Sequence, residues 1–92
     1  MSATTILGVE ATLTGTASNV DSANFVRIHN TGSGVALITI KTAAATPAIV
    51  GSFTMVQGEV LNLQKGSTET IEKTSGTGVP KVVKVGFGVI YN

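Results

Sequence analysis

Short runs of alternating apolar and polar residues are the feature of this sequence that most restricts its fold. In Phe25–Asn30 the aliphatic residues Val26 and Ile28 alternate with polar ones, and in Val60–Gln64 leucines alternate with polar residues. Period-two alternation gives a strand one apolar and one polar face, so each run predicts a half-buried β-strand. Thr, Val and Ile make up about a third of the chain, and their restricted χ1 angles favour extended backbone. An all-β fold is therefore predicted.

The same pattern predicts six to seven short strands separated by turn-forming residues. The predicted strands are residues 7–16, Phe25–Asn30, Ala36–Lys41, 50–56, Val60–Gln64 and 81–91. Turn residues at 30–34 and 57–59 predict hairpins, and the second would pair 50–56 with Val60–Gln64 as antiparallel neighbours. Residues 42–47 are predicted as a loop, 67–72 as a single helical turn, and 73–80 as a long loop.

The last predicted strand carries apolar residues on both faces. Such a strand is either central in its sheet or covered by another subunit. Antiparallel strands of this kind bury their apolar faces by stacking as two sheets or by closing into a barrel. We predict a small antiparallel β-sandwich, or a partly open barrel, of six to seven short strands. The 92 residues have room for one domain, 1–92, in which residues 1–8 form an N-terminal arm.

Charge and composition exclude several classes of function. Charged residues make up only 12% of the chain and the net charge is +1, too little for a nucleic-acid-binding surface. The chain lacks cysteine, so it has neither disulfides nor a thiolate metal site. Its longest apolar run, residues 35–38, is far shorter than the roughly 20 residues of a membrane-spanning helix. The first ten residues lack the basic start of a secretory signal. We expect no nucleic-acid partner and no membrane insertion.

No arrangement of residues predicts catalysis. His29 is the only histidine, and we interpret it as a strand residue at the surface or in an interface rather than a metal ligand or base. The carboxylates are scattered, and Glu69 with Glu72 on one helical turn would supply too few oxygens for calcium. The glycines of residues 75–81 precede a strand and lack the Gly-Lys-Ser/Thr ending of a phosphate-binding loop. We predict no enzymatic activity, no cofactor and no metal.

Five segments together carry a family resemblance. They are TLTGTASNV (12–20), FVRIHNTG (25–32), LITI (37–40), GSFTMVQGEVLNLQKGSTETIE (51–72) and KVVKVGF (81–87). In these segments the chain resembles small virion proteins of tailed bacteriophages, especially those of aquatic and cyanobacterial hosts. Such proteins are all-β modules that coat or reinforce a capsid, or join head and tail, in many symmetric copies. The resemblance implies a capsid decoration or cement protein, or alternatively a neck or tail component, located in the virion and assembled in the host cytoplasm.

The apolar surfaces of the chain exceed what one small domain can bury. We therefore expect a homo-oligomer, a dimer or trimer, or a chain that orders fully on its shell, with the major capsid protein or other virion proteins as partners. The predicted contact residues are Ile6, Leu7, Val50, Val56 and Ile90. The low charge keeps the desolvation cost of such contacts small. A carbohydrate- or ligand-binding β-module is the alternative from another class, but the chain has few aromatic residues for a sugar platform.

Overall fold

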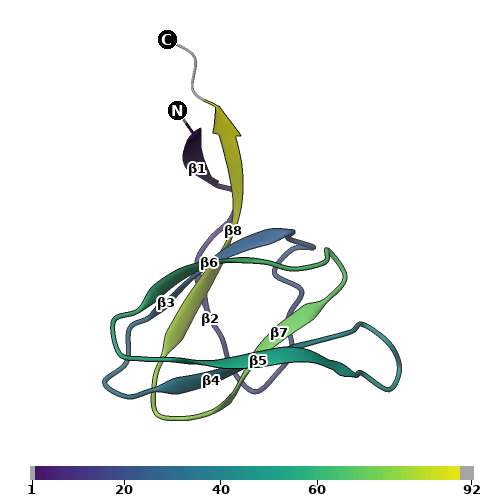
Figure 1. The fold of residues 1–92 in the computed structure, drawn as a ribbon, viewed down its shortest axis with the longest axis vertical. Coiled ribbons are helices and arrows are strands. Elements are labelled where there is room, and N and C mark those ends of the chain that lie inside the picture. The colour runs from purple at the N-terminus through teal and green to yellow at the C-terminus, as the bar shows by residue number, and fades with distance from the viewer. Residues whose placement is uncertain (1, 90–92) are drawn as a thin grey trace.

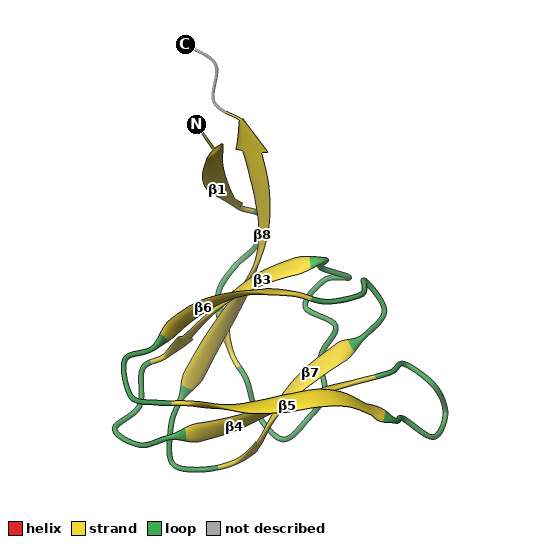
Figure 2. Ribbon diagram, viewed as in Figure 1, coloured by secondary structure: helices red, strands yellow, loops and turns green. Residues whose placement is uncertain are grey.

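Eight strands within residues 2–89 form two antiparallel sheets that stack as a small sandwich (Figures 1 and 2). The structure, a computed structural model, describes the backbone of residues 2–89 and the side chains of residues 4–86. The strands are β1 (Ser2–Ile6), β2 (Ala11–Thr12), β3 (Phe25–Asn30), β4 (Ala36–Lys41), β5 (Ile49–Met55), β6 (Val60–Gln64), β7 (Thr70–Ser75) and β8 (Pro80–Val89). The larger sheet has the order β1-β8-β3-β6, with β2 also paired to β8, and the smaller has the order β5-β4-β7. The predicted all-β class is confirmed. The described residues form no helix that could span a membrane.

The core between the sheets is aliphatic, as the alternation predicts. Val26 and Ile28 of β3 are fully buried, and Ile38 of β4 lies on the facing layer with no exposed surface. The buried core consists of Leu13, Ala23, Val26, Ile28, Ala36, Ile38, Ile40, Met55, Ile71 and Val82, against which Val20, Phe53, Leu61 and Leu63 pack while partly exposed. Burial of a Val, Leu or Ile side chain stabilises the fold by about 1.5–3 kcal/mol, which makes this cluster the main source of stability.

Strand β8 is central in the larger sheet, which explains its apolar residues on both faces. It pairs with β3 on one side and with β1 and β2 on the other. Val82 and Val83, which point to opposite faces, are both at most 4% exposed. The chain at Gly8 lies close against β8, since a Cβ placed there would be 3.9 Å from Lys84 Cβ and 4.0 Å from a methyl group of Val83. Close by, Glu10 forms an ion pair with Arg27 of β3 at 3.6 Å.

The single strand predicted over residues 7–16 is wrong. In its place the chain forms β1 before this segment and the two-residue strand β2 inside it, both paired with β8. The amide of Leu7 still donates to Lys84 O at 2.9 Å, but the chain then leaves the sheet plane. After β2, Leu13 turns into the core and is only 3% exposed. The burial of Leu13 in the core outweighs continued backbone pairing with β8.

The helical turn predicted over residues 67–72 is also wrong, because residues 70–75 form strand β7. Ile71 is fully buried and pairs with Ile40 of β4. On the other edge of β7, Ile71 exchanges two backbone hydrogen bonds with Ser18, at 2.8 and 3.1 Å. Burial of Ile71 and backbone pairing on both sides outweigh the weak local preference for a helical turn. The loop predicted over residues 73–80 is correspondingly shorter.

Neither of the two predicted hairpins forms. The turn at Gly58 has the expected positive φ of 80°, and Glu59 N donates to Val56 O at 3.1 Å. However, β5 pairs with β4 and β6 pairs with β3, so this turn carries the chain from one sheet to the other. The connection from β3 to β4 crosses between the sheets in the same way. The chain crosses because β5 and β6 each complete a different layer around the common core.

A β-bulge in β5 changes the face of the sheet on which Ile49 lies. The pairing of β4 with β5 shifts register between Ile40 and Lys41, so that Ile49 lies opposite Lys41. Residues directly opposite each other share a face of the sheet. Strict alternation along the strand would place Ile49 on the face of Phe53. The extra residue Val50 breaks the period of two, so Ile49 lies on the face of Lys41 instead.

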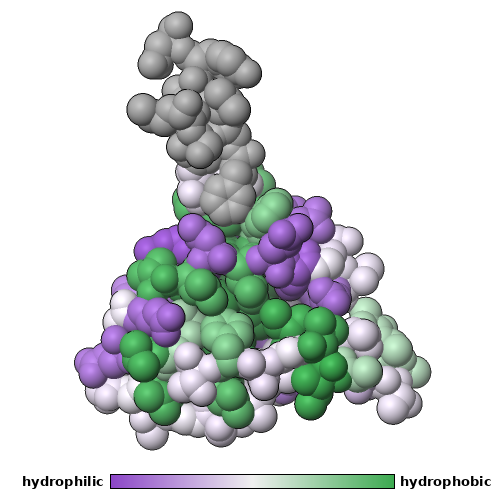
Figure 3. All heavy atoms as spheres, in the orientation of Figure 1, coloured by the Kyte–Doolittle hydropathy of each residue, from purple (hydrophilic) through white to green (hydrophobic). Residues whose placement is uncertain are grey.

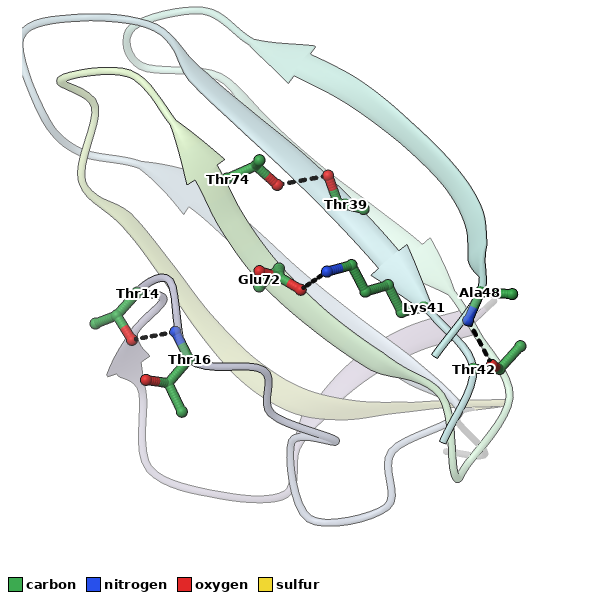
Figure 4. Close-up of polar contacts among 8 residues, drawn as sticks. All are labelled: Thr14, Thr16, Thr39, Lys41, Thr42, Ala48, Glu72 and Thr74. Atoms are coloured by element: carbon green, nitrogen blue, oxygen red, sulfur yellow. Dashed lines mark hydrogen bonds and ion pairs between the residues drawn. The ribbon is translucent and has the colours of Figure 1, made fainter. Parts of the chain in front are cut away.

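Polar side chains of β4 and β7 bind one another on the outward face of the smaller sheet (Figure 4). The hydroxyl oxygens of Thr39 and Thr74 lie 2.6 Å apart across β4 and β7. Lys41 Nζ lies 2.9 Å from Glu72 Oε1 on the same pair of strands. Because these polar groups already satisfy one another, covering this face with a partner would offer little gain from hydrophobic burial.

Candidate interaction surface

His29, Glu69 and Glu72, the residues considered as metal ligands or catalytic groups, do not form a common site. In the described part of the chain, no three His, Asp or Glu side chains gather to hold a metal ion, and no pocket is present. Glu69 Oε1 accepts a hydrogen bond from Gly66 N at 2.6 Å, whereas Glu72 pairs with Lys41. His29 is half-buried on β3, opposite Val60 in the register. The two glutamates thus serve separate local contacts.

The glycines of residues 75–81 serve close packing. Gly76 has a φ of 101°, a conformation that residues with a side chain rarely adopt. Gly78 lies directly against the side chain of Asn30, and a Cβ there would collide with it. Lys73 Nζ donates to Gly78 O at 3.0 Å. The loop is packed onto the end of the sandwich, which explains its glycines without a bound phosphate.

Exposed apolar side chains are the most prominent surface feature. Among the side chains that the structure describes, nine large hydrophobic residues are exposed: Ile6, Leu7, Val9, Val35, Ile49, Val50, Val56, Val60 and Val79. Four of the predicted contact residues, Ile6, Leu7, Val50 and Val56, are between 52% and 57% exposed. The fifth, Ile90, lies outside the described residues. The structure places the four in two groups, one at the end of β1 and the other along β5.

The second group belongs to a larger surface, which we call the β5–β6 patch. It comprises exposed Val50 and Val56 together with half-buried Phe53, Leu61 and Leu63, which belong to β5, β6 and the turn between them. Hydrophobic residues gather over these strands on the face turned to the viewer in Figure 3. β5 and β6 are the last strands of their sheets, and no described strand pairs with the far edge of either. Apolar surface beside two unpaired strand edges is typical of a protein interaction site.

The first group lies where a two-stranded ribbon leaves the body of the sandwich (Figure 1). Residues 86–89 of β8 pair only with β1, because the pairing of β8 with β3 ends at Val85. The ribbon contributes to the elongated shape, with extents of 44 × 33 × 20 Å. A two-stranded ribbon without further support is only marginally stable in water. This segment is therefore a second candidate contact region.

Asn30 is a buried polar residue that the sequence analysis missed. Its Nδ2 donates to Gly34 O at 2.9 Å, Met55 O at 3.2 Å and Val56 O at 3.1 Å. Its Oδ1 accepts from Val79 N at 3.0 Å. One amide thus joins the three connections that cross between the sheets at this end. The alternation along β3 could have identified Asn30 as buried, because Asn30 follows Val26 and Ile28 on the inward face of the strand.

Lys65 is the second buried polar residue that was missed. It is only 5% exposed, and its ammonium donates to Ala23 O at 2.7 Å and to Gly66 O at 3.1 Å. The alternation along β6 predicts the burial of Lys65 as well, since Lys65 follows Leu61 and Leu63 on the inward face.

The loop that Lys65 holds contains a left-handed turn. Val20, Asp21 and Ser22 have φ values of 53°, 55° and 56°. For residues other than glycine this conformation costs roughly 1–2 kcal/mol each. Ala23 at the end of the turn is fully buried and accepts the lysine hydrogen bond. Lys65 therefore helps to stabilise a loop whose backbone conformation is intrinsically unfavourable.

The buried ammonium predicts an alkaline pH dependence of stability. Desolvation lowers the pKa of Lys65 from its ordinary value of 10.5, and the negative charge of Glu69 opposes this shift only in part. Between the lowered pKa and 10.5 the unfolded chain binds the proton more tightly than the folded chain, so the free energy of unfolding rises with pH in that interval. Urea denaturation at a series of pH values checks this. In Lys65→Met this contribution to the pH dependence should disappear, and an unchanged dependence would contradict the assignment.

Comparison with known proteins supports the fold alone. No protein-family model and no curated protein sequence matches this chain. The crystal structure of PirA is similar to it, with a TM-score of 0.50, 17% sequence identity and coverage of 90% of both chains. At this identity the similarity indicates a shared arrangement of strands and carries no information on function. The chain is thus described by its fold, a small antiparallel β-sandwich.

Proposed function

We propose that this chain is a structural protein of a phage particle, a capsid decoration or cement protein that binds and stabilises the head shell. The β5–β6 patch is the observation that carries the proposal. Strands β5 and β6 contain no charged residue, expose several aliphatic side chains and have unpaired outer edges. A lone soluble protein usually protects such edges with lysine, proline or a covering segment. The patch therefore fits a surface that is covered in an assembly.

The major capsid protein, or another virion protein, is the partner that fits this role. Burial of about 800 Å² per partner is usual for a stable interface, and the aliphatic side chains of the patch would form its apolar centre. With a net charge of only +1, many copies can bind near one another with little mutual repulsion. A small protein that bridges neighbouring shell subunits stabilises the shell by adding binding energy to its assembled form. The family resemblance of the five sequence segments supports the same role.

Val50→Lys is expected to weaken binding to the shell by at least about tenfold, since a charge in an apolar interface must be desolvated. Co-sedimentation of the purified chain with undecorated heads measures the binding. Val9→Lys is the matched control, because Val9 is 91% exposed and lies outside the patch. Equal binding by the two variants would show that the patch does not contact the shell.

Cryo-electron microscopy of the source particle distinguishes the two positions in the virion. Density for this chain over the head surface supports the decoration role. Density only at the neck or tail would replace it with the alternative virion role. Absence of the chain from the purified particle would refute both.

A further inference from the structure

We propose that copies of this chain associate head to tail by pairing the outer edge of β1 of one copy with the outer edge of β6 of the next. The pairing would continue the larger sheet from molecule to molecule. This inference goes beyond the proposed function, because the pairing between copies does not depend on binding to the capsid.

The order of strands makes the two edges complementary. The larger sheet runs β1-β8-β3-β6, so β1 and β6 are its two ends. Every neighbouring pair in this order is antiparallel, and three successive reversals leave β6 running opposite to β1. A second copy in the same orientation therefore presents its β1 antiparallel to the β6 of the first. Each strand is five residues long, which allows pairing along the whole of both edges.

Neither edge carries the features that normally prevent strand pairing. Ser2–Ile6 and Val60–Gln64 contain no charged residue and no proline. Ile6 is 57% exposed and Val60 is 48% exposed, so each edge also offers apolar surface. In the described part of the chain, no strand pairs with the far side of either. Lysine and proline are common on natural edge strands because they block such pairing, and these two strands have neither.

A second copy is the occupant that these edges fit. β1 cannot reach β6 of its own chain, because β8 and β3 lie between them and neighbouring strands are about 4.8 Å apart. The ribbon of β1 and the end of β8 projects from the body (Figure 1), where another molecule can approach it. A third strand would give this ribbon the support that a two-stranded ribbon lacks. The small net charge adds little repulsion between copies.

Head-to-tail pairing has a definite consequence for symmetry. A contact between two different surfaces closes into a ring if the rotation between copies permits, and otherwise forms a filament. The expected products are therefore a trimer or larger ring, or an open chain, instead of a two-fold dimer. Both a closed ring and an open chain are compatible with many symmetric copies of the protein on one particle.

A complementation experiment tests the inference. Ile6→Lys alters the β1 edge, Val60→Lys alters the β6 edge, and Val35→Lys is the control because Val35 is 50% exposed but lies in no strand. Multi-angle light scattering measures the mass of each purified chain, and circular dichroism verifies the β-fold. For each edge variant, the protein concentration at which half of the chains are associated is expected to rise at least about tenfold. The added charge must lose its hydration when the two strands pair. The control is expected to associate like the unmodified chain.

Mixing the two edge variants gives the decisive result. Each retains the edge that the other has lost, so an equimolar mixture should form a 1:1 dimer and nothing larger. If only Ile6→Lys abolishes association, the contact joins two β1 edges; if only Val60→Lys does, it joins two β6 edges. Either result overturns the head-to-tail pairing. Should one variant fail to fold, Thr4→Lys or Gln64→Lys tests the same edge at an exposed polar position.

The shell experiment separates the two proposals. A chain that remains monomeric at about 100 µM, a concentration that assembles interfaces of micromolar affinity, contradicts the head-to-tail pairing whether or not it binds heads. A chain that assembles but does not bind heads contradicts the decoration role and leaves the pairing intact.

Discussion

Asn30→Asp is expected to lower the free energy of unfolding by about 3–5 kcal/mol, most of the stability of a domain this small. The Nδ2 group of Asn30 donates to three carbonyl oxygens at 2.9–3.2 Å, and the residue is fully buried. Aspartate has nearly the same shape but would place a carboxylate oxygen against these three acceptors. The buried charge would keep only the amide of Val79 as a donor, and the three carbonyl groups would lose theirs.

Urea denaturation followed by circular dichroism measures this effect. Asn62→Asp is the matched control, because Asn62 lies exposed on β6 and the same change there should alter stability by less than about 0.5 kcal/mol. If both variants are equally stable, Asn30 does not join the crossing connections as described. Unfolding of Asn30→Asp without denaturant would agree with the expected loss.

Ile71→Ala is expected to lower the free energy of unfolding by about 3 kcal/mol. Ile71 is fully buried in the core, and removing most of its side chain leaves a cavity between the sheets. β7 is paired with β4 on one side and with Ser18 on the other, so the surroundings of Ile71 have little freedom to collapse into the space. The change also tests strand β7 itself, since a residue on a solvent-exposed helical turn would tolerate alanine.

Ile49→Ala provides the comparison on the same sheet. Ile49 is 67% exposed, so the identical substitution should change stability by less than about 0.5 kcal/mol. The two variants are compared by the urea concentration at the midpoint and by the slope of the transition. Equal midpoints would place Ile71 outside the core and contradict the assignment of β7.

The sequence predicted the strands wherever alternation was regular. Phe25–Asn30, Ala36–Lys41 and Val60–Gln64 have the predicted bounds, and their inward residues face the core. Apolar residues on both faces of the last strand predicted either a central strand or one covered by another subunit, and β8 is central in its sheet. Four predicted contact residues are exposed, which agrees with their proposed role but does not test it.

Prediction failed where a local preference competed with distant contacts. The turn at Gly58 has the local geometry of a hairpin, but its strands belong to different sheets. Ser18 and β4 together make residues 70–75 a strand, and neither partner is close in the sequence. Val50 forms a bulge that reverses the face of Ile49, which strict alternation cannot foresee.

Where the apolar and polar residues alternate regularly, the residue pattern alone predicts the strand and its apolar face, because side-chain direction in a strand follows from local geometry. The pattern also contained the inward positions of Asn30 and Lys65 as a continuation of that alternation. Which strands pair, which edges remain open and where the exposed valines lie relative to one another follow from the three-dimensional fold. These depend on contacts between residues distant in the chain, whose free energies outweigh the preferences of any single turn.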